Sequence, residues 1–540
     1  MKKTTFLISL FAIISHIATV AQQQKISPAR KLQIAEFAIS HLYVDTVDEN
    51  SLVETAIIKM LEQLDPHSTY ANPEEVKKMN EPLQGNLEGI GVQFNMAEDT
   101  LLVIQPVVNG PSEKAGILAG DRIITVNDSS IAGVKMKTDE IMRRLRGPKG
   151  SKVKVGIIRR GINEPLSFIV TRDKIPVHSV DAAHLIQNGI GYIRINNFGA
   201  TTVKEFNDAM KKLQKQGMKD LILDLQGNGG GYLNAAVELA NEFLGPKELI
   251  VYTEGIRSPR NSFYAQGTGN FQKGRLIILV DSYTASASEI VTGAVQDWDR
   301  GIVVGRRSFG KGLVQRPVDL PDGSMIRLTI ARYYTPTGRC IQKPYESIEK
   351  YNEDLINRYN SGEMSNADSI HFPDSLKYRT KRLERVVYGG GGIMPDYYVP
   401  VDTTRYSNYH LQLSAKGAIL KATLNYVDKH RNELKTRYKS FEDFDRHFTV
   451  PQELTDALIT AGKEAGVTYN DKEYKHSQSL IHTQLKALVA RDLWDMNEYY
   501  RIMNRENESV QKALQLLKEE DFEGLMTKKQ AARPNKTKHN

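Results

Sequence analysis

The sequence predicts a multidomain α+β protein with an α/β core of βαβ units, an inserted β-rich domain, and helical N- and C-terminal regions. Three observations support this fold class. Strand-like and helix-like segments alternate along residues 185–345, which is typical of parallel βαβ units. Residues 84–175 hold short β-like runs with two helical pieces between them. Towards both ends of the chain, apolar residues recur at the three- and four-residue spacing of helices.

The N-terminal helical region is expected over residues 28–80. The segments ARKLQIAEFAISHLY (29–43) and SLVETAIIKMLEQL (51–64) carry apolar residues at helical spacing. The segment LDPHSTYANPEE (64–75) then predicts a turn interrupted by proline and the start of a further helix.

The β-rich domain is expected over residues 84–175, which is long enough for a small domain. Its predicted strands are GVQFNM (91–96), LLVIQPV (101–107), RIITVND (122–128), KVKVGIIRR (152–160) and LSFIVTRD (166–173). Its two helical pieces are SEKAGIL (112–118) and TDEIMRRLRG (138–147).

The α/β core is expected over residues 180–400. Its predicted strands cover 189–196, 220–226, 249–254, 275–280 and 301–305, and the helices between them cover 202–217, 232–244 and 286–298. Residues 401–526 are polar with helical spacing, which predicts a C-terminal helical extension. The tail 527–540 is basic and lacks large apolar residues, so we expect it to be disordered.

Residues 1–21 are expected to be a secretory signal. A positively charged start precedes an apolar stretch, and the small residues Thr19 and Ala21 stand at −3 and −1 of a cut before Gln22. A membrane anchor left uncut is the alternative, although the apolar run is short for a stable span. The pattern therefore predicts an exported protein.

Charge and cysteine content argue against several classes of protein. The net charge of +8 is a mild excess for 540 residues, and no dense basic stripe is interleaved with aromatics, so no nucleic-acid partner is expected. Cys340 is the single cysteine, with no histidine between His184 and His371, and we interpret it as a small buried filler. Neither a cofactor nor a metal is expected, because the chain lacks a P-loop lysine and suitably spaced ligand carboxylates.

Three loops of the core are expected to lie at one edge of the sheet. They are QGNGGG (226–231), DSYTASAS (281–288) and RRSFGKG (306–312), and each follows a predicted strand. The carboxyl ends of neighbouring parallel strands share one edge, and loops that leave this edge are the usual place for a site.

The residues of these loops have chemistry that suits acyl transfer. Lys311 stands between two glycines, and burial near other cations would lower its pKa enough for a neutral amine to accept a proton. The glycine loop can offer bare backbone N–H groups to an oxyanion or a phosphate, and its spacing does not match the phosphate-binding patterns. An oxyanion hole is therefore the better interpretation.

The stretch 281–291 carries four hydroxyls, on Ser282, Thr284, Ser286 and Ser288. Ser286 and Glu289 fit the capping box S-x-x-E at a helix start, so a purely structural role is one reading. A serine at a helix N-terminus with a lysine from the next loop would form a Ser/Lys dyad. These residues leave the two readings about equal.

A second site is predicted at Gly89, Ile90, Gly91 and Val92. A Gly-Φ-Gly-Φ loop that opens a strand can offer N–H groups to a terminal carboxylate while a peptide adds as an extra strand. A plain tight turn is the alternative.

Taken together, these motifs resemble the carboxy-terminal processing protease family, also called tail-specific proteases, from about Tyr43 to Asp396. The resemblance is carried by LDPHSTY (64–70), GIGV (89–92), GPSEKAGILAGDRI (110–123), DLQGNGGG (224–231), TASASEI (284–290), SFGKGLVQ (308–315) and GGGIMPD (390–396). It implies a Ser/Lys protease core over 180–400 and an inserted PDZ-like domain over 84–175.

The resemblance also implies roles for individual residues. Ser286 would be the nucleophile, Lys311 the general base, and Gln315 the residue that orients the amine. The N–H groups of Ala287 and of either Gly229 or Gly230 would form the oxyanion hole. Asp297 matches an acidic position of the family that we interpret as structural. The sequence departs from the family pattern in Gln226, where arginine is frequent, and in Cys340, where serine is common.

The expected function is that of an exported serine endopeptidase, periplasmic in a Gram-negative cell. Its PDZ-like domain would recognise proteins or peptides with apolar C-termini, and the terminal helical regions could join two copies in a homo-oligomer. A catalytically inert PDZ-type peptide-binding scaffold is the alternative.

Overall fold

The computed structural model describes residues 26–97 and 99–527 of the chain. The signal predicted at 1–21 lies outside the described residues, as does the predicted C-terminal tail apart from Thr527. The chain divides into two compact units, of which the first ends at Tyr70 and the second begins at Ala71. The short strand β1 (Thr69–Ala71) spans this division.

The first unit consists of two helices, α2 (Pro28–Leu42) and α3 (Glu49–Glu62). The side chain of Ser27 accepts a hydrogen bond from the N–H of Arg30 and so caps α2, and Asp48 caps α3 in the same way. Both helices predicted for this region are confirmed.

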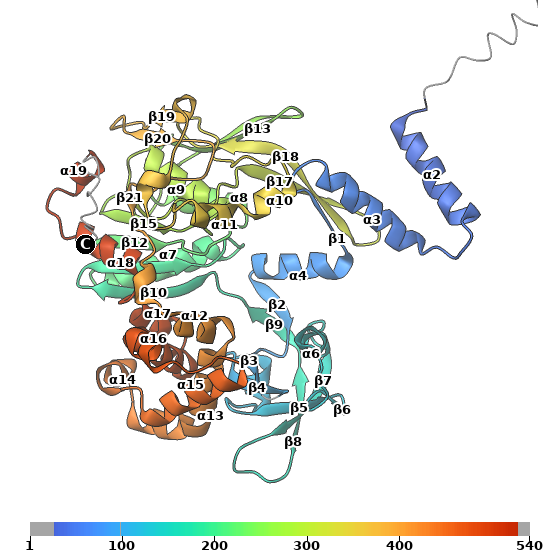
Figure 1. Cartoon of the computed structure of the whole chain (residues 1–540), viewed down its shortest axis with the longest axis vertical. Helices are drawn as coiled ribbons and strands as arrows, with labels where there is room; N and C mark the ends of the chain where they lie inside the picture. The colour runs from blue at the N-terminus through green and yellow to red at the C-terminus, as the bar shows by residue number, and fades with distance from the viewer. Residues whose placement is uncertain (1–25, 98, 528–540) are drawn as a thin grey trace, which may run out of the picture. The chain divides into compact units, whose positions relative to one another are not determined.

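The second unit begins with α4 (Pro73–Leu83), which starts at a capping box between Asn72 and Glu75. This is the helix start that the proline-containing turn predicts. The helix leads directly into strand β2 (Asn86–Gly89), which pairs antiparallel with β9 (Asp173–Pro176). This strand pair joins the β-rich domain to the rest of the unit (Figure 1).

The β-rich domain is an antiparallel sheet of six strands in the order β3-β4-β5-β7-β8, with β6 paired to β5. The strands are β3 (Val92–Ala97), β4 (Thr100–Pro106), β5 (Arg122–Val126), β6 (Ser129–Ser130), β7 (Lys152–Ile158) and β8 (Leu166–Thr171). Two helices, α5 (Pro111–Ala115) and α6 (Thr138–Leu145), accompany the sheet. Every strand and helix predicted for this domain is confirmed. A separate apolar core, with Leu101, Ile123 and Ile141 fully buried, holds the sheet and α6 together.

The core contains a six-stranded sheet in the order β10-β11-β12-β15-β16-β21. These strands are β10 (Val180–Gln187), β11 (Ile190–Ile195), β12 (Asp220–Asp224), β15 (Leu276–Val280), β16 (Ile302–Gly305) and β21 (Tyr397–Tyr398). Within this sheet, β11, β12, β15, β16 and β21 run parallel, as the βαβ pattern predicts, whereas β10 is antiparallel to β11.

Helices bury both faces of this sheet (Figure 1). The helices α7 (Thr202–Lys215), α8 (Leu233–Asn241) and α9 (Ala287–Asp297) pack on one face. The C-terminal helices α18 (Glu508–Leu516) and α19 (Phe522–Thr527) pack on the other. The parallel strands are therefore apolar on both sides, as such strands usually are.

The strand predicted at 249–254 lies outside the parallel sheet, so the expectation that it continues the βαβ alternation is wrong. It is β13 (Leu249–Gly255), in an antiparallel sheet with β14 (Ser258–Tyr264), β18 (Met325–Tyr334) and β17 (Leu313–Asp319). All five residues of the parallel strand β15 are buried, whereas β13 mixes buried, half-buried and exposed positions, as is common in an antiparallel strand with one face towards solvent.

Short elements complete the core between β18 and β21. They are the helices α10 (Ile348–Asn352) and α11 (Asp354–Asn360), the paired strands β19 (Lys377–Arg379) and β20 (Val386–Tyr388), and three short 3₁₀ turns at Ala367–Ser369, Asp374–Leu376 and Thr403–Arg405.

The predicted helical extension is confirmed as helical, and most of it has an apolar core of its own. Its helices are α12 (Asn408–Ala415), α13 (Ala418–Arg437), α14 (Phe441–His447), α15 (Gln452–Glu464), α16 (Asp471–Leu493) and α17 (Met496–Met503), followed by α18 and α19. Stacked and edge-on aromatic side chains, among them Phe444, Phe448 and Trp494, fill that core. We call residues 408–503 the helical domain.

None of the helices in the described ranges combines the length and the apolar character that a membrane crossing requires.

Candidate active site and peptide groove

The three predicted loops lie together at the carboxyl edge of the parallel sheet. Strands β12, β15 and β16 are parallel neighbours, so the loops that follow them share one edge as expected. A cavity of about 450 Å³ lies there, and α4 contributes to its wall. The lining includes the residues that the sequence proposes for catalysis: Ser286, Lys311, Gln315, Ala287, Gly229 and Gly230.

The four hydroxyls of the stretch 281–291 have different surroundings. Those of Thr284 and Ser288 are fully buried and donate hydrogen bonds to backbone carbonyls of the segment 225–228, at 2.9 and 3.0 Å. The hydroxyl of Ser282 lies 3.4 Å from a methionine sulfur. Of the four residues, Ser286 alone lines the cavity. The hydroxyls of Thr284 and Ser288 therefore hold the loop, whereas Ser286 is the residue of this set at the cavity.

Ser286 stands in an unusual backbone conformation at the start of α9, with φ 56° and ψ −115°. A non-glycine residue in such a conformation costs on the order of 1–3 kcal/mol, and the surrounding structure must hold it there. The backbone of Gly230 packs closely against this turn. A Cβ at Gly230 would lie 2.8 Å from Ser286 Cβ and 2.9 Å from the backbone N of Ala287. A glycine is therefore required for this close approach.

Asn228 fixes the glycine loop from within. This fully buried side chain donates to the carbonyl of Ile195 at 2.8 Å and accepts from the N–H of Gly230 at 2.8 Å. Because the Gly230 amide is engaged in this way, Gly229 is the better candidate for a free donor to an oxyanion. The sequence left the choice between these two glycines open.

Glu289 joins the two loops that carry Ser286 and Lys311. Its side chain is fully buried in the first turn of α9. One carboxylate oxygen accepts from the N–H of Ser286 at 2.8 Å and from the N–H of Lys311 at 2.9 Å. The other accepts from the Ser308 hydroxyl at 2.5 Å and the N–H of Gly310 at 2.7 Å. The capping-box glutamate therefore also sets the spacing between the two loops.

Burial raises the pKa of Glu289 to about 7, against four hydrogen bonds that favour its ionised form. The three backbone donors can only donate, so an ionised carboxylate satisfies all of them, whereas a protonated one carries a hydrogen of its own. The protonation state of Glu289 thus bears directly on how the two loops are held.

Lys311 sits in a tightly packed turn, as its flanking glycines predict. A Cβ on Gly310 would lie 2.9 Å from the N of Gly392, and a Cβ on Gly312 would lie 2.9 Å from the N of Gln342. Both glycines therefore serve close backbone packing around the lysine.

Two further side chains connect to this region from the antiparallel sheet. The hydroxyl of Tyr333, on β18, donates to the carbonyl of Lys311 at 2.5 Å and lies 3.1 Å from the carbonyl of Ser286. Gln315, on β17, lines the cavity and donates to the Thr329 hydroxyl at 3.2 Å. Nothing in the sequence indicates this role for Tyr333, because the hydroxyl's two acceptors lie 22 and 47 positions away along the chain.

Asp297 is buried on α9 and forms an ion pair with the equally buried Arg339 at 2.6 Å. It is not among the residues that line the cavity, in keeping with a structural interpretation. Cys340 is half-buried, so the description of it as a buried filler overstates its burial. Burial nevertheless raises the pKa of its thiol.

Gln226 stands where arginine is frequent in the family, and a positive charge beside it is supplied by Arg194 of β11. The guanidinium of Arg194 donates to Asp224 and to the carbonyl of Gln226, each at 2.7 Å. The Gln226 side chain accepts from Asn507, at the start of α18, at 2.8 Å. This departure from the family pattern is thus matched by contacts to the C-terminal helices.

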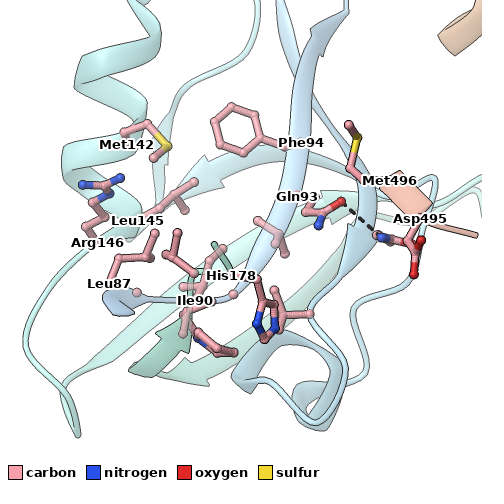
Figure 2. A pocket seen from close by; sticks show the side chains of 18 of the residues that line it. Leu87, Ile90, Gln93, Phe94, Met142, Leu145, Arg146, His178, Asp495 and Met496 are labelled. Atoms are coloured by element: carbon pink, nitrogen blue, oxygen red, sulfur yellow. Dashed lines mark hydrogen bonds between the residues drawn. The ribbon is translucent and has the colours of Figure 1, made fainter. Parts of the chain in front are cut away.

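The predicted peptide site forms a groove of about 450 Å³ on the β-rich domain (Figure 2). Gly89, Ile90, Gly91 and Val92 all line it, together with apolar side chains of β3 and α6. Gly91 has φ 72°, and a Cβ there would lie 2.8 Å from Ile175 Cδ1. The loop therefore needs glycine at this position.

Two hydrogen bonds from Ser112 hold the Gly89–Val92 loop. The carbonyl of Ile90 accepts from the N–H of Ser112 at 2.9 Å and from its hydroxyl at 2.7 Å. Strand β3 is the edge of its sheet and, within the described residues, pairs with β4 alone. Its other edge is open to an added strand.

Residues from the helical domain also line the groove, which the sequence did not predict. They are Arg491, Asp495 and Met496, at the junction of α16 and α17. They stand about 400 positions along the chain from the Gly89–Val92 loop, and no local motif marks them.

The fold and the two cavities define a peptidase-like α/β core with an inserted peptide-binding β domain, and family models match both parts. The model of peptidase family S41 matches residues 189–349, and the model of the PDZ domain matches residues 89–182. Residues 13–75 match the N-terminal domain of the activating protease CtpB. Residues 409–495 match a family of unknown function.

Similar proteins point to one family. A carboxy-terminal-processing protease of Bartonella bacilliformis is 36% identical over 56% of this chain and 69% of its own length. The carboxy-terminal processing protease CtpA of Bacillus subtilis is 36% identical over 58% of this chain and 66% of its own length. The chain therefore belongs to the carboxy-terminal processing protease family. It spans about two thirds of the length of these relatives.

A solved structure of a photosystem II D1 C-terminal processing protease is 31% identical to the chain. It covers 57% of this chain and 82% of its own, with a TM-score of 0.33.

Proposed function

We propose that this protein is an exported serine endopeptidase that binds the C-terminal tails of proteins in its PDZ domain and hydrolyses peptide bonds with a Ser/Lys dyad. One observation carries the proposal: Ser286 and Lys311 line the same cavity, on loops that a single buried carboxylate, Glu289, holds together. Export rests on the sequence pattern of residues 1–21.

In the proposed reaction, Ser286 Oγ attacks the carbonyl carbon of the scissile peptide bond. The neutral amine of Lys311 takes the hydroxyl proton as the new C–O bond forms. Collapse of the tetrahedral intermediate breaks the C–N bond, and the lysine returns the proton to the leaving amine. Water then attacks the acyl-enzyme, again with Lys311 as the base, and releases the acid and the free serine.

Three features of the cavity support this chemistry. The N–H groups of Ala287 and Gly229 are the candidates to stabilise the oxyanion, and the start of α9 adds a positive partial charge beside them. Gln315 is the candidate to orient the lysine amine. The turn at Ser286 presents the hydroxyl in a backbone conformation that the glycine loop supports.

Tail binding rests on the groove. The N–H groups of the Gly89–Val92 loop would bind the terminal carboxylate, and the tail would add to the open edge of β3. The apolar side chains of Ile90 and Leu145 would then surround the last side chain of the tail. An apolar C-terminus is the expected preference.

The test is the substitution Lys311→Ala. Loss of a general base should lower turnover of an unfolded substrate with an apolar C-terminus by about 10³-fold. Binding of a tail peptide, measured by fluorescence anisotropy, should be unchanged. Turnover close to that of the wild type would refute the dyad. Tail binding without cleavage by the wild type would favour an inert peptide-binding scaffold.

A further inference from the structure

The peptide groove has two walls, and one of them belongs to the helical domain. Strand β3 and helix α6 form the first wall, with Phe94, Met142 and Leu145. Asp495 and Met496, at the start of α17, form the second. In Figure 2, Phe94 and Met142 lie on one side of β3, whereas Gln93 lies on the other side, next to Asp495 and Met496.

The position of the second wall is fixed by contacts with the PDZ domain and with the protease core. On the side of the PDZ domain, Leu102 and Ile104 of β4 pack against Leu424 of α13. Arg122 of β5 forms an ion pair with Asp428 of α13 at 2.8 Å. These contacts fix the helical domain against the sheet that carries β3.

On the side of the protease core, Asn497 of α17 anchors the same segment. Its side-chain oxygen accepts from the N–H of Ala183, on β10, at 3.0 Å and lies 3.0 Å from Nδ1 of His184. Asp495 and Met496 directly precede Asn497, so their positions are set by this anchor. The second wall is thus a defined part of the fold.

The geometry of an added strand determines which side chains of a tail would meet this wall. Successive side chains of a β-strand point to opposite faces. If the last side chain of the tail points towards α6, the penultimate one points to the opposite face, which is the face of Gln93. On an isolated PDZ domain that face would be open to water. Here Asp495 and Met496 stand over it.

The charges of the second wall favour one class of side chain. Asp495 is exposed and caps α17, where its carboxylate accepts from the N–H of Asn497 at 2.7 Å. Arg491 is the nearest basic residue of the helical domain in the groove, and its charge is paired with the buried Asp492 at 2.8 Å. The wall therefore presents a carboxylate beside the apolar thioether of Met496.

Two further titratable groups of the groove belong to the protease core. His178 is exposed, and its ring lies 3.6 Å from the Glu205 carboxylate. Asp181 accepts a hydrogen bond from Asn196, and burial raises its pKa. The group that faces a penultimate side chain without a basic residue paired to it is therefore Asp495, whose titratable neighbour is the carboxyl of Glu498.

We propose that the helical domain is a specificity element that reads the penultimate residue of a bound tail. Asp495 and Met496 select a long side chain with an apolar stem and a positive end, such as lysine, over an acidic one. This inference rests on the proposed function, because it requires that the groove bind C-terminal tails. The inference assigns a role to the helical domain, most of which matches a family of unknown function.

The test uses the full chain with Ser286→Ala, so that bound peptides stay intact. The probes are two fluorescein-labelled peptides that end in leucine and differ in the penultimate residue, lysine or glutamate. Fluorescence anisotropy should show tighter binding of the lysine peptide. Asp495→Asn, which keeps the capping ability of the side chain, should lower the ratio of the two affinities about threefold.

Asp471→Asn is the matched control. It removes a carboxylate from the exposed start of α16, in the same domain but outside the groove lining, and should leave the ratio unchanged. Met496→Ala provides a second variant, which should weaken binding of the lysine peptide more than that of a peptide with penultimate glycine. Met142→Ala, on the first wall, should affect both of these peptides alike.

The outcomes separate the two proposals. If no peptide binds to the parent chain, the proposed tail recognition is wrong and this inference fails with it. If the peptides bind but neither Asp495→Asn nor Met496→Ala changes the preference at the penultimate residue, the groove function stands and the role of the helical domain is refuted.

Discussion

The cavity proposed for catalysis, which we call the catalytic cavity, and the peptide groove have the same volume, about 450 Å³, but their walls come from the chain in different ways. Most of the catalytic cavity comes from residues 229–333, on loops and strands of one α/β core. The groove combines a loop at residues 89–92 with residues 491–496 of a separate helical domain. Local sequence motifs therefore mark most of the catalytic cavity, but in the groove they mark the Gly89–Val92 loop and not the residues of the helical domain.

The difference extends to how each site is held. In the catalytic cavity, one carboxylate accepts four hydrogen bonds and links both loops. In the groove, the two walls are joined through contacts between domains, such as the Arg122–Asp428 ion pair. We therefore expect single substitutions to damage the catalytic cavity severely and the groove by degrees.

Outside the proposed dyad itself, the largest effect is expected from Glu289→Gln. The amide can accept from only one side, and its NH₂ group faces N–H donors, so the loops of Ser286 and Lys311 lose their common anchor. We expect kcat to fall by about 100-fold, since misplacement by about 1 Å can have that effect. Steady-state kinetics on a tail-bearing peptide would measure it.

A matched control exists in the same core. Glu242 is also a buried carboxylate that accepts from a backbone N–H, but it does not line the cavity. Glu242→Gln should lower stability without lowering kcat. Equal losses of kcat in the two variants would show that Glu289 acts on the fold alone.

The pH dependence of the wild type follows from the same carboxylate. The pKa of Glu289 is about 7, and the ionised form satisfies all its donors. Protonation below this pH weakens the anchor, so kcat/KM should fall as the pH decreases from 8 to 6. The Glu289→Gln variant should show a smaller fall, because only the protonation of Lys311 in the proposed dyad then lowers kcat/KM. A fall of equal size in the variant would assign it to another group.

An intermediate effect is expected from Gly91→Ala in the groove. The added Cβ would lie 2.8 Å from Ile175 Cδ1, on a residue with φ 72°, so the carboxylate loop must shift. The Kd for a tail peptide should rise about tenfold, which corresponds to roughly 1.4 kcal/mol. Cleavage at saturating substrate should change little.

Gly133→Ala controls for the backbone conformation. This residue of the same domain has φ 70° and open space around its Cβ position. Tail affinity close to that of the wild type is the expected result. If Gly133→Ala weakened the tail as much as Gly91→Ala, the effect would arise from destabilisation of the domain.

The smallest effect is expected from His184, which lies beside the anchor of the groove's second wall. Burial lowers its pKa to about 4 from an ordinary value of 6.5, and its Nε2 is buried without a partner. The fold therefore favours the neutral ring, whose stabilising contribution is complete above pH 6.5 and is lost as the pH falls towards 4.

Compared with a His184→Gln variant, the wild type should therefore lose less than about 1 kcal/mol of the free energy of unfolding when the pH falls from 7 to 6. Urea unfolding followed by the fluorescence of the two tryptophans, Trp298 and Trp494, would measure this change. The His184→Gln variant should lack only this part of the pH dependence, and a slope equal to that of the wild type would assign the effect to other groups.

The sequence predicts more of the catalytic cavity than of the peptide groove. The shared location of Ser286 and Lys311 follows from the βαβ alternation and local motifs, because parallel strands bring their carboxyl ends to one edge. The joint role of Glu289 could not be read, since S-x-x-E also describes an ordinary helix cap. Asn228 lies inside the glycine loop, yet its contacts with Ile195 and Gly230 appear only in three dimensions.

The second wall of the groove had no signal in the sequence at all. Asp495 and Met496 resemble any polar helix start, and their place beside β3 depends on how the helical domain packs against Leu102 and Ile104. The misassigned strand at 249–254 has a related cause. Pairing between strands far apart in sequence, here β13 with β18, decides its sheet.

If cleavage and tail recognition belong to separate sites, Ser286→Ala should separate them most directly. Wild type and variant would be compared for cleavage of an unfolded protein with an apolar C-terminus and for the Kd of its tail peptide. We predict that the variant loses cleavage and keeps the Kd of the wild type. Retained cleavage, or loss of tail binding together with cleavage, would contradict this account.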